Sequence, residues 1–510
     1  MSAIPEEPHQ STPDDSLPPT ATATSTSAST SASTSTEEAP TPTPAEDSGS
    51  SRSRQGVWAL LRRLHFYAGV FVAPFLFLAA LTGLAYTLTP QLDQLVYGDK
   101  LHVARVVGQP HPLADQVAAA RAAYSEGSLA YVVTPPTAED TTRVVLNVPG
   151  LENDRQRTVF VDPYTNEVKG DLTTWFDETP LTTWFDDLHR NLHLGETGRL
   201  YSEVAASWLW VLVLGGLALW LGRARGQRAR TMRGVLVPDR SARGVRRTRS
   251  WHAVTGVWLS VGLLGLSATG LTWSHYAGER FGSLLDAVHA HAPALDTSLD
   301  SKEPNGGSAK AGGEHTGHGT AHEAGHGEAS GFDVSLAAAR DAGLGGSLTL
   351  TPPAEPGNAW SVAQDDRVWP VHLDQMAVDT RTGDVTAHNK WSDYPLLAKL
   401  SKLGVAAHMG VLFGIANQIA LALVAIGLIL GLTWGYRMWW LRRPTRGDRR
   451  AAFGRAPARG VWRQLPLPVL LLGIPATIAL GWALPVLGVT LLGFLVMDVL
   501  TGVVQRRRHA

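Results

Sequence analysis

The stretch HFYAGVFVAPFLFLAALTGL, residues 65–84, is long and apolar enough to cross a bilayer, which takes about 20 residues of helix. It reappears as HAVTGVWLSVGLLGLSATGL, residues 252–271. In both stretches a glycine follows the first histidine after four residues, and a Thr-Gly pair follows it after 17 and 18. Unrelated apolar helices would rarely agree at all these positions. The chain is therefore expected to contain an internal repeat of a membrane-spanning unit.

Long apolar blocks account for much of the rest of the chain. Four are clear and two more follow near the C-terminus, which predicts an α-helical integral membrane protein with about six transmembrane helices. The blocks are Phe66–Leu88, Val204–Leu221, Ala253–Trp273, Val411–Trp434, Leu465–Leu480 and Leu484–Leu500, the last two separated by Pro485.

Charge is segregated, although the formal net charge of the chain is only −1. Residues 223–249 hold ten arginines and residues 437–463 hold nine. The positive-inside rule places both links in the cytoplasm, together with the two basic termini, and six spans satisfy this arrangement. Residues 89–199 and 274–402 then face outward. We expect a multi-pass protein of the cytoplasmic (inner) membrane with both termini inside.

Composition excludes several kinds of chemistry. The chain has no cysteine, so disulfides, thiolate metal sites, iron–sulfur clusters and covalent haem attachment through CxxCH are all excluded. The first fifty residues are rich in Ser, Thr, Pro and Ala, which predicts a disordered tail. No GxGxxG follows a cytoplasmic strand, so no nucleotide-binding domain is expected. A nucleic-acid partner is not expected either.

The repeat continues into the two outward segments. QVAAARAAY with a later TPP is echoed by SLAAARDAG with TPP, and VDPYTNEV (161–168) is echoed by VDTRTGDV (378–385). A short helix, β-rich stretches and a turn marked by Asp, Thr and Asn or Gly favour a small α+β module with a βαββ-like order. The complete fold prediction is six spans with two outward α+β modules in an internal repeat.

Each half of the repeat carries a histidine near either end of its spans. His65 would meet His252 near the inner face, and His193 would meet His408 near the outer face. Two imidazoles on neighbouring helices can supply both axial ligands of a b-type haem, and nearby glycines let the flat macrocycle approach the backbone. We therefore predict two haem b groups. The alternative is that these histidines are polar anchors at the membrane interface.

The remaining histidines have less defined roles. His189 lies one helical turn before His193 and is a further cofactor-binding candidate, as an alternative ligand, as a supporting neighbour of one, or as part of an outer substrate site. His275 is a weaker candidate. The segment EHTGHGTAHEAGHGE is an insertion without a counterpart in the first half. Its imidazoles favour binding of Cu, Zn or Ni, or else it is a solvated loop. The candidate metal ligands there are His315, His318, His322 and His326.

These observations define the expected boundaries along the chain. They are a cytoplasmic tail (1–55), transmembrane helix 1 (56–90), outward module 1 (91–190), transmembrane helix 2 (191–222), a basic cytoplasmic loop (223–250), transmembrane helix 3 (251–275), outward module 2 (276–400) with its His-rich insertion (301–330), transmembrane helix 4 (401–441), a second basic loop (442–464), transmembrane helices 5 and 6 (465–505) and a basic tail (506–510).

Together these motifs resemble the PepSY-associated transmembrane family. The resemblance rests on HxxxG with a later TGL, on VDPYTNEV, on LHRNLHLGETGR (188–199) and on YRMWWLRRP (436–444), and it covers residues 62–444. The family includes iron-regulated inner-membrane proteins and ferric-siderophore reductases. The resemblance implies that both outward segments are PepSY modules. It also implies that the family's span histidines fall on His65, His193, His252 and His408.

The function that follows from this resemblance is electron transfer across the membrane. Two b-type haems would pass electrons to a ferric siderophore or another Fe(III) chelate at the outer face, and no acid, base or nucleophile of the protein is required. The donor would be a membrane quinol or a cytoplasmic reductase. The alternative is a non-enzymatic membrane sensor or uptake accessory that binds iron or copper, the copper version depending on the His-rich insertion.

Overall fold

The computed structural model describes residues 48–152, 155–226, 236–299, 329–441 and 467–507. Nearly all of the His-rich insertion and the whole second basic loop lie outside these residues, as does most of the predicted tail. The described part of the tail is helical, because helix α1 (Ser48–Phe71) begins before position 56. The chain therefore has its first ordered element earlier than the sequence predicts.

Several helices are long and apolar enough to cross a membrane. Within the described residues four qualify alone, and a fifth span forms if the bent pair α1 and α2 (Ala73–Tyr86) is counted as one. The four are α6 (Gly195–Gly226), α8 (Gly244–Thr272), α12 (Ile415–Leu441) and α14 (Pro485–Arg507). Helix α13 (Leu467–Ala483) is apolar but shorter, with 17 residues. Pro485 begins α14, so the predicted division of the C-terminal hairpin is confirmed.

The first span is bent where a proline follows its midpoint. The axes of α1 and α2 differ by 56° at Val72, and Pro74 stands in the first turn of α2. Proline has no N–H to donate and its ring crowds the preceding turn, so a helix kinks there. Because of the bend, the axis of α2 departs from that of α1. Helix α2 packs against α5 (Pro180–Asn191) as well as against α6 and α12.

The spans share one apolar core. Helix α8 packs against both α6 and α12. Trp208 of α6 is the largest fully buried side chain of the described residues, with 1% of its surface exposed. Its neighbours come from α1, α2, α6, α8 and α14, and they include Ala68, Val72, Leu76, Leu212, Leu263 and Leu487.

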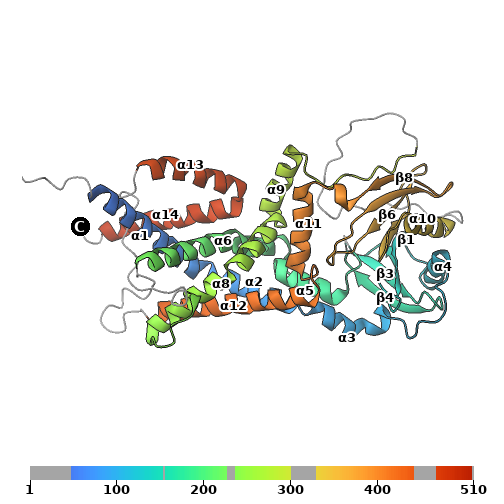
Figure 1. Cartoon of the computed structure of the whole chain (residues 1–510), viewed down its shortest axis with the longest axis horizontal. Coiled ribbons are helices and arrows are strands. Elements are labelled where there is room, and N and C mark those ends of the chain that lie inside the picture. Colours follow the sequence, from blue (N-terminus) through green and yellow to red (C-terminus); the bar gives the residue numbers. More distant parts are fainter. Residues whose placement is uncertain (1–47, 153–154, 227–235, 300–328, 442–466, 508–510) are drawn as a thin grey trace, which may run out of the picture. The chain divides into compact units, whose positions relative to one another are not determined.

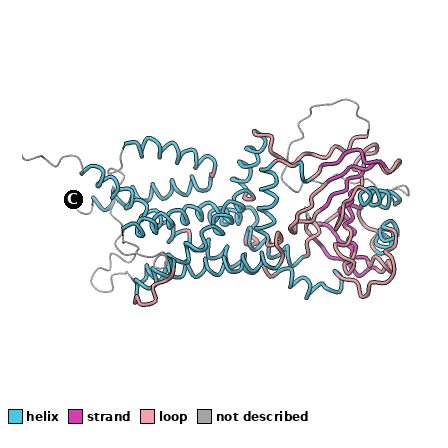
Figure 2. Tube along the Cα trace, in the orientation of Figure 1, coloured by secondary structure: helices cyan, strands magenta, loops and turns pink. Residues whose placement is uncertain are grey.

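The two segments predicted to face outward form one antiparallel sheet of eight strands rather than two separate modules (Figures 1 and 2). The strand order is β4-β3-β2-β1-β5-β6-β7-β8, so each segment is a four-stranded meander and the two meet at β1 and β5. The strands are β1 (Ser128–Val133), β2 (Thr142–Asn147), β3 (Gln156–Val161), β4 (Val168–Thr174), β5 (Leu348–Thr351), β6 (Trp360–Gln364), β7 (Gln375–Asp379) and β8 (Asp384–Asn389).

The expected βαββ order is wrong. In each segment one helix, α4 (Leu113–Ala123) or α10 (Ala329–Asp341), precedes four strands, and no described strand precedes either helix. Both helices lie on the same face of the sheet and share one buried cluster with its strands (Figure 1). The outermost strands β4 and β8 hold few buried residues. Such polar edge strands lack the apolar alternation by which strands are recognised in a sequence.

The predicted Asp-Thr-Asn/Gly turn is confirmed in both segments. The Asp162 carboxylate accepts a hydrogen bond from the backbone N–H of Tyr164 at 2.9 Å, and Asp379 accepts one from Arg381 at 3.0 Å. Asn166 and Gly383 then adopt positive φ angles of 58° and 80°. Asparagine and glycine are the residues that tolerate this conformation, which explains their place in the motif.

Short helices connect the sheet to the spans. Helix α5 follows β4, and α11 (Leu396–Met409) follows β8 after the turn of 3₁₀ helix Trp391–Asp393. Helices α3 (Thr89–Leu101) and α9 (His275–Ala287) lead out of the first and third spans. Helix α5 packs on α2 and α6, while α11 packs on α8. The side chains of α5 and α11 are therefore placed where the sheet and the spans come together.

Candidate functional site

Two pairs of histidines lie between the helices. The first, which we call the basic-end pair, consists of His65 on α1 and His252 on α8. Their ring centres are 6.3 Å apart and the ring planes make an angle of 68°. The predicted meeting of these two residues is thus found in the structure.

The basic-end histidines differ in their hydrogen bonds. Nδ1 of His252 donates to the carbonyl oxygen of Gly431 at 2.9 Å. This contact fixes the neutral ring as the Nδ1–H tautomer, because a carbonyl can only accept. Nδ1 of His65 is buried without a hydrogen-bond partner. The carbonyl of Leu212 is the nearest acceptor to His65, but the contact does not reach hydrogen-bond geometry.

The second pair, which we call the module-end pair, consists of His189 on α5 and His408 on α11. Their ring centres are 6.5 Å apart, close to the spacing of the basic-end pair. Nδ1 of His189 lies 2.9 Å from the hydroxyl of Thr82, and Nδ1 of His408 lies 2.7 Å from that of Thr269. These threonines belong to the two Thr-Gly pairs by which the repeat was recognised.

The threonines determine which nitrogen of each module-end ring carries the proton. The Thr82 hydroxyl donates to the backbone carbonyl of Leu78 at 2.9 Å, and that of Thr269 donates to Gly265 at 2.8 Å. A hydroxyl has only one proton, so each threonine oxygen accepts from the imidazole Nδ1–H. Nε2 of His189 and of His408 is consequently an unprotonated lone-pair donor, as a metal-ligating imidazole requires.

His193 does not meet His408, which corrects the pairing expected from the sequence. It lies beyond the end of α5, with a positive φ of 55°, and its exposed ring packs on Trp184 at 5.0 Å. Leu192 also has positive φ and closes the helix as its left-handed C-cap. Because the chain turns there, positions 189 and 193 are not successive turns of one helix, and only His189 faces inward.

The expected pairing was wrong because His193-Leu-Gly resembles His408-Met-Gly. This similarity aligned the two halves of the repeat four residues away from the alignment that the structure shows. In the structure His189 corresponds to His408, and the carbonyls beside His65 and His252 belong to Leu212 and Gly431. His189 and His408 differ by 219 residues, as do Leu212 and Gly431. One sequence signal could have identified the register, since Gly216 and Gly435 each lie 27 residues after the inward-facing histidine.

Glycines lie against all four rings. A Cβ atom at Gly83 would lie 3.1 Å from the His189 ring, and one at Gly216 would lie 3.2 Å from the His65 ring. The corresponding distances are 3.6 Å from Gly270 to His408 and 3.9 Å from Gly435 to His252. A larger side chain at Gly83 or Gly216 would press on the imidazole. Glycine at these positions therefore lets neighbouring helices approach the histidines closely.

The other histidines of the described residues form no metal site. His275 is 3.9 Å from Glu279, and His291 is 2.9 Å from Asp286, both as isolated pairs. No group of three or more His, Cys, Asp or Glu side chains suited to a metal ion occurs in the described part of the chain. The candidate ligands His315, His318, His322 and His326 lie outside that part.

Acidic and hydroxyl groups surround the start of α5, the helix that carries His189. The Asp93 carboxylate accepts hydrogen bonds from the hydroxyls of Thr179 and Thr182, both at 2.6 Å. Desolvation, with a smaller contribution from the nearby carboxylates of Asp186 and Asp177, raises the pKa of the neighbouring Glu178 to about 8. Glu178 is therefore largely protonated at neutral pH.

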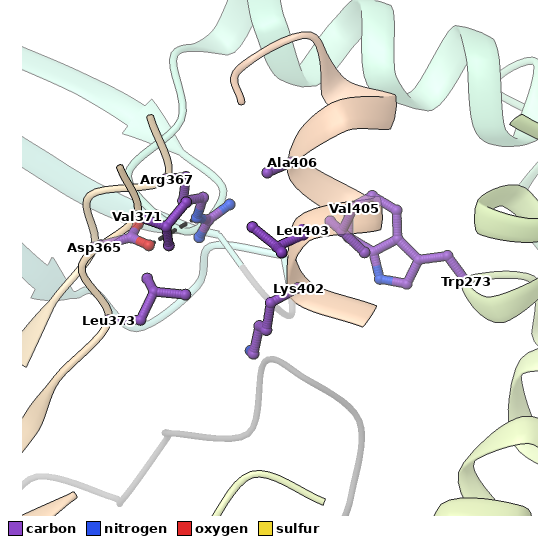
Figure 3. A pocket seen from close by; sticks show the side chains of 9 residues that line it. All are labelled: Trp273, Asp365, Arg367, Val371, Leu373, Lys402, Leu403, Val405 and Ala406. Atoms are coloured by element: carbon purple, nitrogen blue, oxygen red, sulfur yellow. Dashed lines mark hydrogen bonds and ion pairs between the residues drawn. The ribbon is translucent and has the colours of Figure 1, made fainter. Parts of the chain in front are cut away.

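A small pocket of about 70 Å³ lies between the β6–β7 connection and α11, the helix that carries His408 (Figure 3). One wall is the connection between β6 and β7, where Arg367 and Asp365 form an ion pair of 2.7 Å. The opposite wall is α11, with Lys402 and Ala406, and Trp273 at the end of α8 completes the lining. Trp273 lies four residues after Thr269, which is about one helical turn. The pocket is thus linked to His408 through α11, where Ala406 precedes it by two residues, and through α8, where Thr269 bonds to its ring.

Comparison with known proteins identifies one family. The family model described as the PepSY-associated TM region matches residues 62–442, about three quarters of the chain. This region contains all four paired histidines, the sheet and the pocket, whereas α13 and α14 lie beyond it. A search of curated proteins found no match to the chain.

Proposed function

The chain belongs to the PepSY-associated transmembrane family, and we propose that it is a membrane electron-transfer protein with two haem b groups that reduces an Fe(III) chelate, such as a ferric siderophore. The basic-end pair would hold one haem and the module-end pair the other. The observation that carries the proposal is the pairing of four histidines at two nearly equal ring spacings.

The ring spacings suit a metal ion held between two imidazoles. A nitrogen–metal distance of about 2.0 Å on each side separates the two ring centres by roughly 6 Å. The observed values are 6.3 and 6.5 Å. Two histidines packed only as interface anchors have no reason to repeat this spacing at both ends of the spans.

The donor chemistry also suits haem. Three of the four rings hold their proton on Nδ1 through a carbonyl or a threonine, which leaves Nε2 to bind a metal. All four histidines are partly buried among neighbouring helices. When bound, haem supplies one-electron redox chemistry, and axial histidines help to set its potential.

The two pairs contact opposite ends of the first and third spans, because His65 and His252 lie near the start of these spans and Thr82 and Thr269, which bond to the module-end rings, lie near their end. His252 and Thr269 are 17 residues apart on the continuous helix α8, which corresponds to about 25 Å of helix. The hydrocarbon core of a bilayer is about 30 Å thick. Two haems at these positions would carry charge over most of the membrane. The residues of this chain would fix the rings, exclude water with the apolar span core and present the outer site to the sheet.

The pocket beside the module-end pair is the proposed docking place for the chelate. Lys402 and the ion pair of Arg367 with Asp365 line it, and the two cations would attract an anionic group, while Trp273 offers an aromatic wall. At about 70 Å³ the pocket would receive one ligating group of the chelate, with the rest outside it. Fe(II) binds hard oxygen donors more weakly than Fe(III) does, so reduction would release the metal. The protein needs no acid, base or nucleophile for this step.

The proposed direction of transfer follows from the charge distribution. Ten arginines in residues 223–249 and nine in residues 437–463 favour a cytoplasmic location for the basic end and for both termini. The module end then faces outward from the inner membrane. The electron donor would be a quinol or a cytoplasmic reductase.

A second candidate is a non-enzymatic membrane sensor or uptake accessory for iron or copper. It is favoured by one observation, the four histidines among glycines and acidic residues in the His-rich insertion. Deletion of residues 314–328 separates the two candidates. A copper-binding role predicts that copper binding disappears with the deletion, whereas the electron-transfer role predicts that it leaves any haem spectrum unchanged.

An absorption spectrum of the detergent-purified protein tests the proposal. After expression with ample haem supply, two haems per chain and a low-spin Soret band typical of two axial histidines are expected. Absence of stoichiometric haem under these conditions would refute the electron-transfer function. Oxidation of the reduced protein by a ferric chelate then tests the substrate class.

A further inference from the structure

The last helix, α14, lies outside the region matched by the family, yet it is built into the helix bundle. Asp498 of α14 forms an ion pair with Arg63 of α1. Thr490, two helical turns earlier, accepts a hydrogen bond from the indole N–H of Trp208 at 2.9 Å. Phe494, between them, packs on both Phe71 and Trp208 at ring distances of 5.5 and 5.4 Å. Thr490, Phe494 and Asp498 thus form one face of α14 that packs on both α1 and α6.

The ion pair and the basic-end histidine occupy opposite faces of α1. Successive residues of an α-helix are about 100° apart, so Arg63 and His65 are separated by about 200°. Arg63 and Phe71 lie on the face directed at α14, and His65 lies on the face directed at α8 and His252. Helix α1 is therefore held between α14 on one side and the partner of its histidine on the other.

The contact between α14 and α6 also bears on the position of His65. Trp208, which bonds to Thr490, lies one helical turn before Leu212, whose carbonyl is beside Nδ1 of His65. Gly215 and Gly216 follow on α6 against the His65 ring. Helix α1, which carries His65, and helix α6, which packs against its ring, thus both contact the same face of α14.

An aspartate within an apolar span is costly, so its presence calls for a partner and a role. Asp498 lies inside the candidate span of residues 485–504. Its partner Arg63 is 9% exposed and also stacks over Tyr67 at 5.6 Å. The pair is only partly buried, with 11% of the Arg63 side chain and 40% of the Asp498 side chain exposed. Removing one member still leaves an uncompensated charge within an apolar span, whereas the pair itself adds specificity of position more than stability.

We propose that Asp498 is a positioning residue of the basic-end pair. Its ion pair with Arg63 fixes the rotation of α1 about its own axis, so that His65 faces His252. The C-terminal hairpin of α13 and α14 is thereby part of this site. The consequence for haem rests on the proposed function, but the positioning of His65 does not. The module-end pair, which has no contact with Asp498 among the described residues, is left unaffected.

Cross-linking tests the positioning without haem. The chain has no cysteine, so His65→Cys with His252→Cys gives a single pair that a short bis-maleimide can bridge. We expect Asp498→Asn to lower the cross-link yield severalfold and Asp498→Glu, which keeps the charge, to retain it. Met497→Leu, next to Asp498 and 60% exposed, is the matched control and should have no effect. An unchanged yield in Asp498→Asn would overturn the proposal.

A double variant covers the case in which Asp498→Asn fails to fold. Arg63→Met with Asp498→Leu removes both charges and leaves no lone buried ion. The proposal predicts a reduced cross-link yield here too, because the tie between α1 and α14 is gone. A yield equal to that of the unaltered pair would contradict it.

The haem readout extends the test to the histidines themselves. In Asp498→Asn the low-spin electron paramagnetic resonance signal of one haem should shift while that of the other stays, and Asp498→Glu should restore it. Equal changes in both signals would mean a general loss of structure and would overturn the proposal. If the unaltered protein holds no haem, the proposed function fails, and the cross-link yields still decide the role of Asp498.

Discussion

The basic-end and module-end pairs have nearly the same ring spacing but are built from different parts of the molecule. His65 and His252 lie on long helices that are candidate spans. His189 and His408 lie on α5 and α11, short helices that connect the last strands of each meander to the spans. The position of the module-end pair therefore depends both on the connection to the sheet and on packing of α5 and α11 against the spans, whereas that of the basic-end pair depends on packing between the spans.

The two pairs also differ in the groups that hydrogen-bond to their rings. A backbone carbonyl of α12 holds His252, while threonine hydroxyls of the first and third spans hold His189 and His408. A hydroxyl can be removed by substitution and a carbonyl cannot. The difference suggests that the module-end site is open to adjustment by single residues, and it gives the following ways to separate the two sites.

The largest expected effect is the loss of one haem of two. His65→Ala or His252→Ala removes an axial ligand of the basic-end site and leaves the module-end pair intact. Haem content, measured by the pyridine haemochrome assay, should fall from two per chain to one. Retention of both haems in either variant would show that this pair is not a ligand pair.

Removal of the threonine hydroxyls should have a smaller effect, confined to the module end. Thr82→Val and Thr269→Val leave the imidazole Nδ1–H without its acceptor, and loss of such a partner typically costs about 10–100-fold in metal affinity. Haem transfer to apomyoglobin should therefore be faster from one of the two sites. Thr433→Val is a matched control, because this threonine bonds only within α12 and should leave both rates unchanged.

The smallest expected effect is a pH dependence at the module end. The raised pKa of Glu178 means that the folded protein holds this proton between pH 4.5 and about 8 while the unfolded chain releases it. Stability should accordingly fall as the pH rises through this range. At about 1.4 kcal/mol per pKa unit the full shift would correspond to roughly 5 kcal/mol. Because Glu178 is partly accessible, solvent screening reduces this, and a loss of about 1–2 kcal/mol is expected.

Glu178→Gln keeps the shape of the side chain and removes its titration. Thermal unfolding of the detergent-purified variant should show a weaker decline between pH 5 and pH 8 than that of the unaltered protein. Parallel curves for the two proteins would mean that Glu178 does not titrate in this range. The spectrum of the basic-end haem should be the same at both pH values.

The comparison also explains which features the sequence could predict. His65 and His252 each stand 17 residues before a Thr-Gly pair, so regular helix geometry carries their register through a whole span. The sequence did not identify His189 as the partner of His408, because helix α5 ends at Leu192 and His193. Their positive φ angles turn the chain there, and no local sequence pattern predicts this turn. The short motif around His193 then matched His408 more closely than the true counterpart did.

The sheet shows a similar division. The turn residues Asp162 and Asp379 were predictable because their chemistry is local. The union of two meanders through β1 and β5 was not, since it depends on the pairing of Val132 with Leu350 and of Val133 with Thr349, more than 200 residues apart. Likewise, the pairing of Arg63 with Asp498 requires knowledge of how α14 packs.

The most direct test of the account compares two histidines four residues apart. His189→Ala should reduce the haem content from two per chain to one, with the same loss in His408→Ala, because these two rings face each other at 6.5 Å. His193→Ala should retain both haems and both low-spin signals, because its exposed ring packs on Trp184. Loss of a haem in His193→Ala, with two haems kept in His189→Ala, would contradict the account.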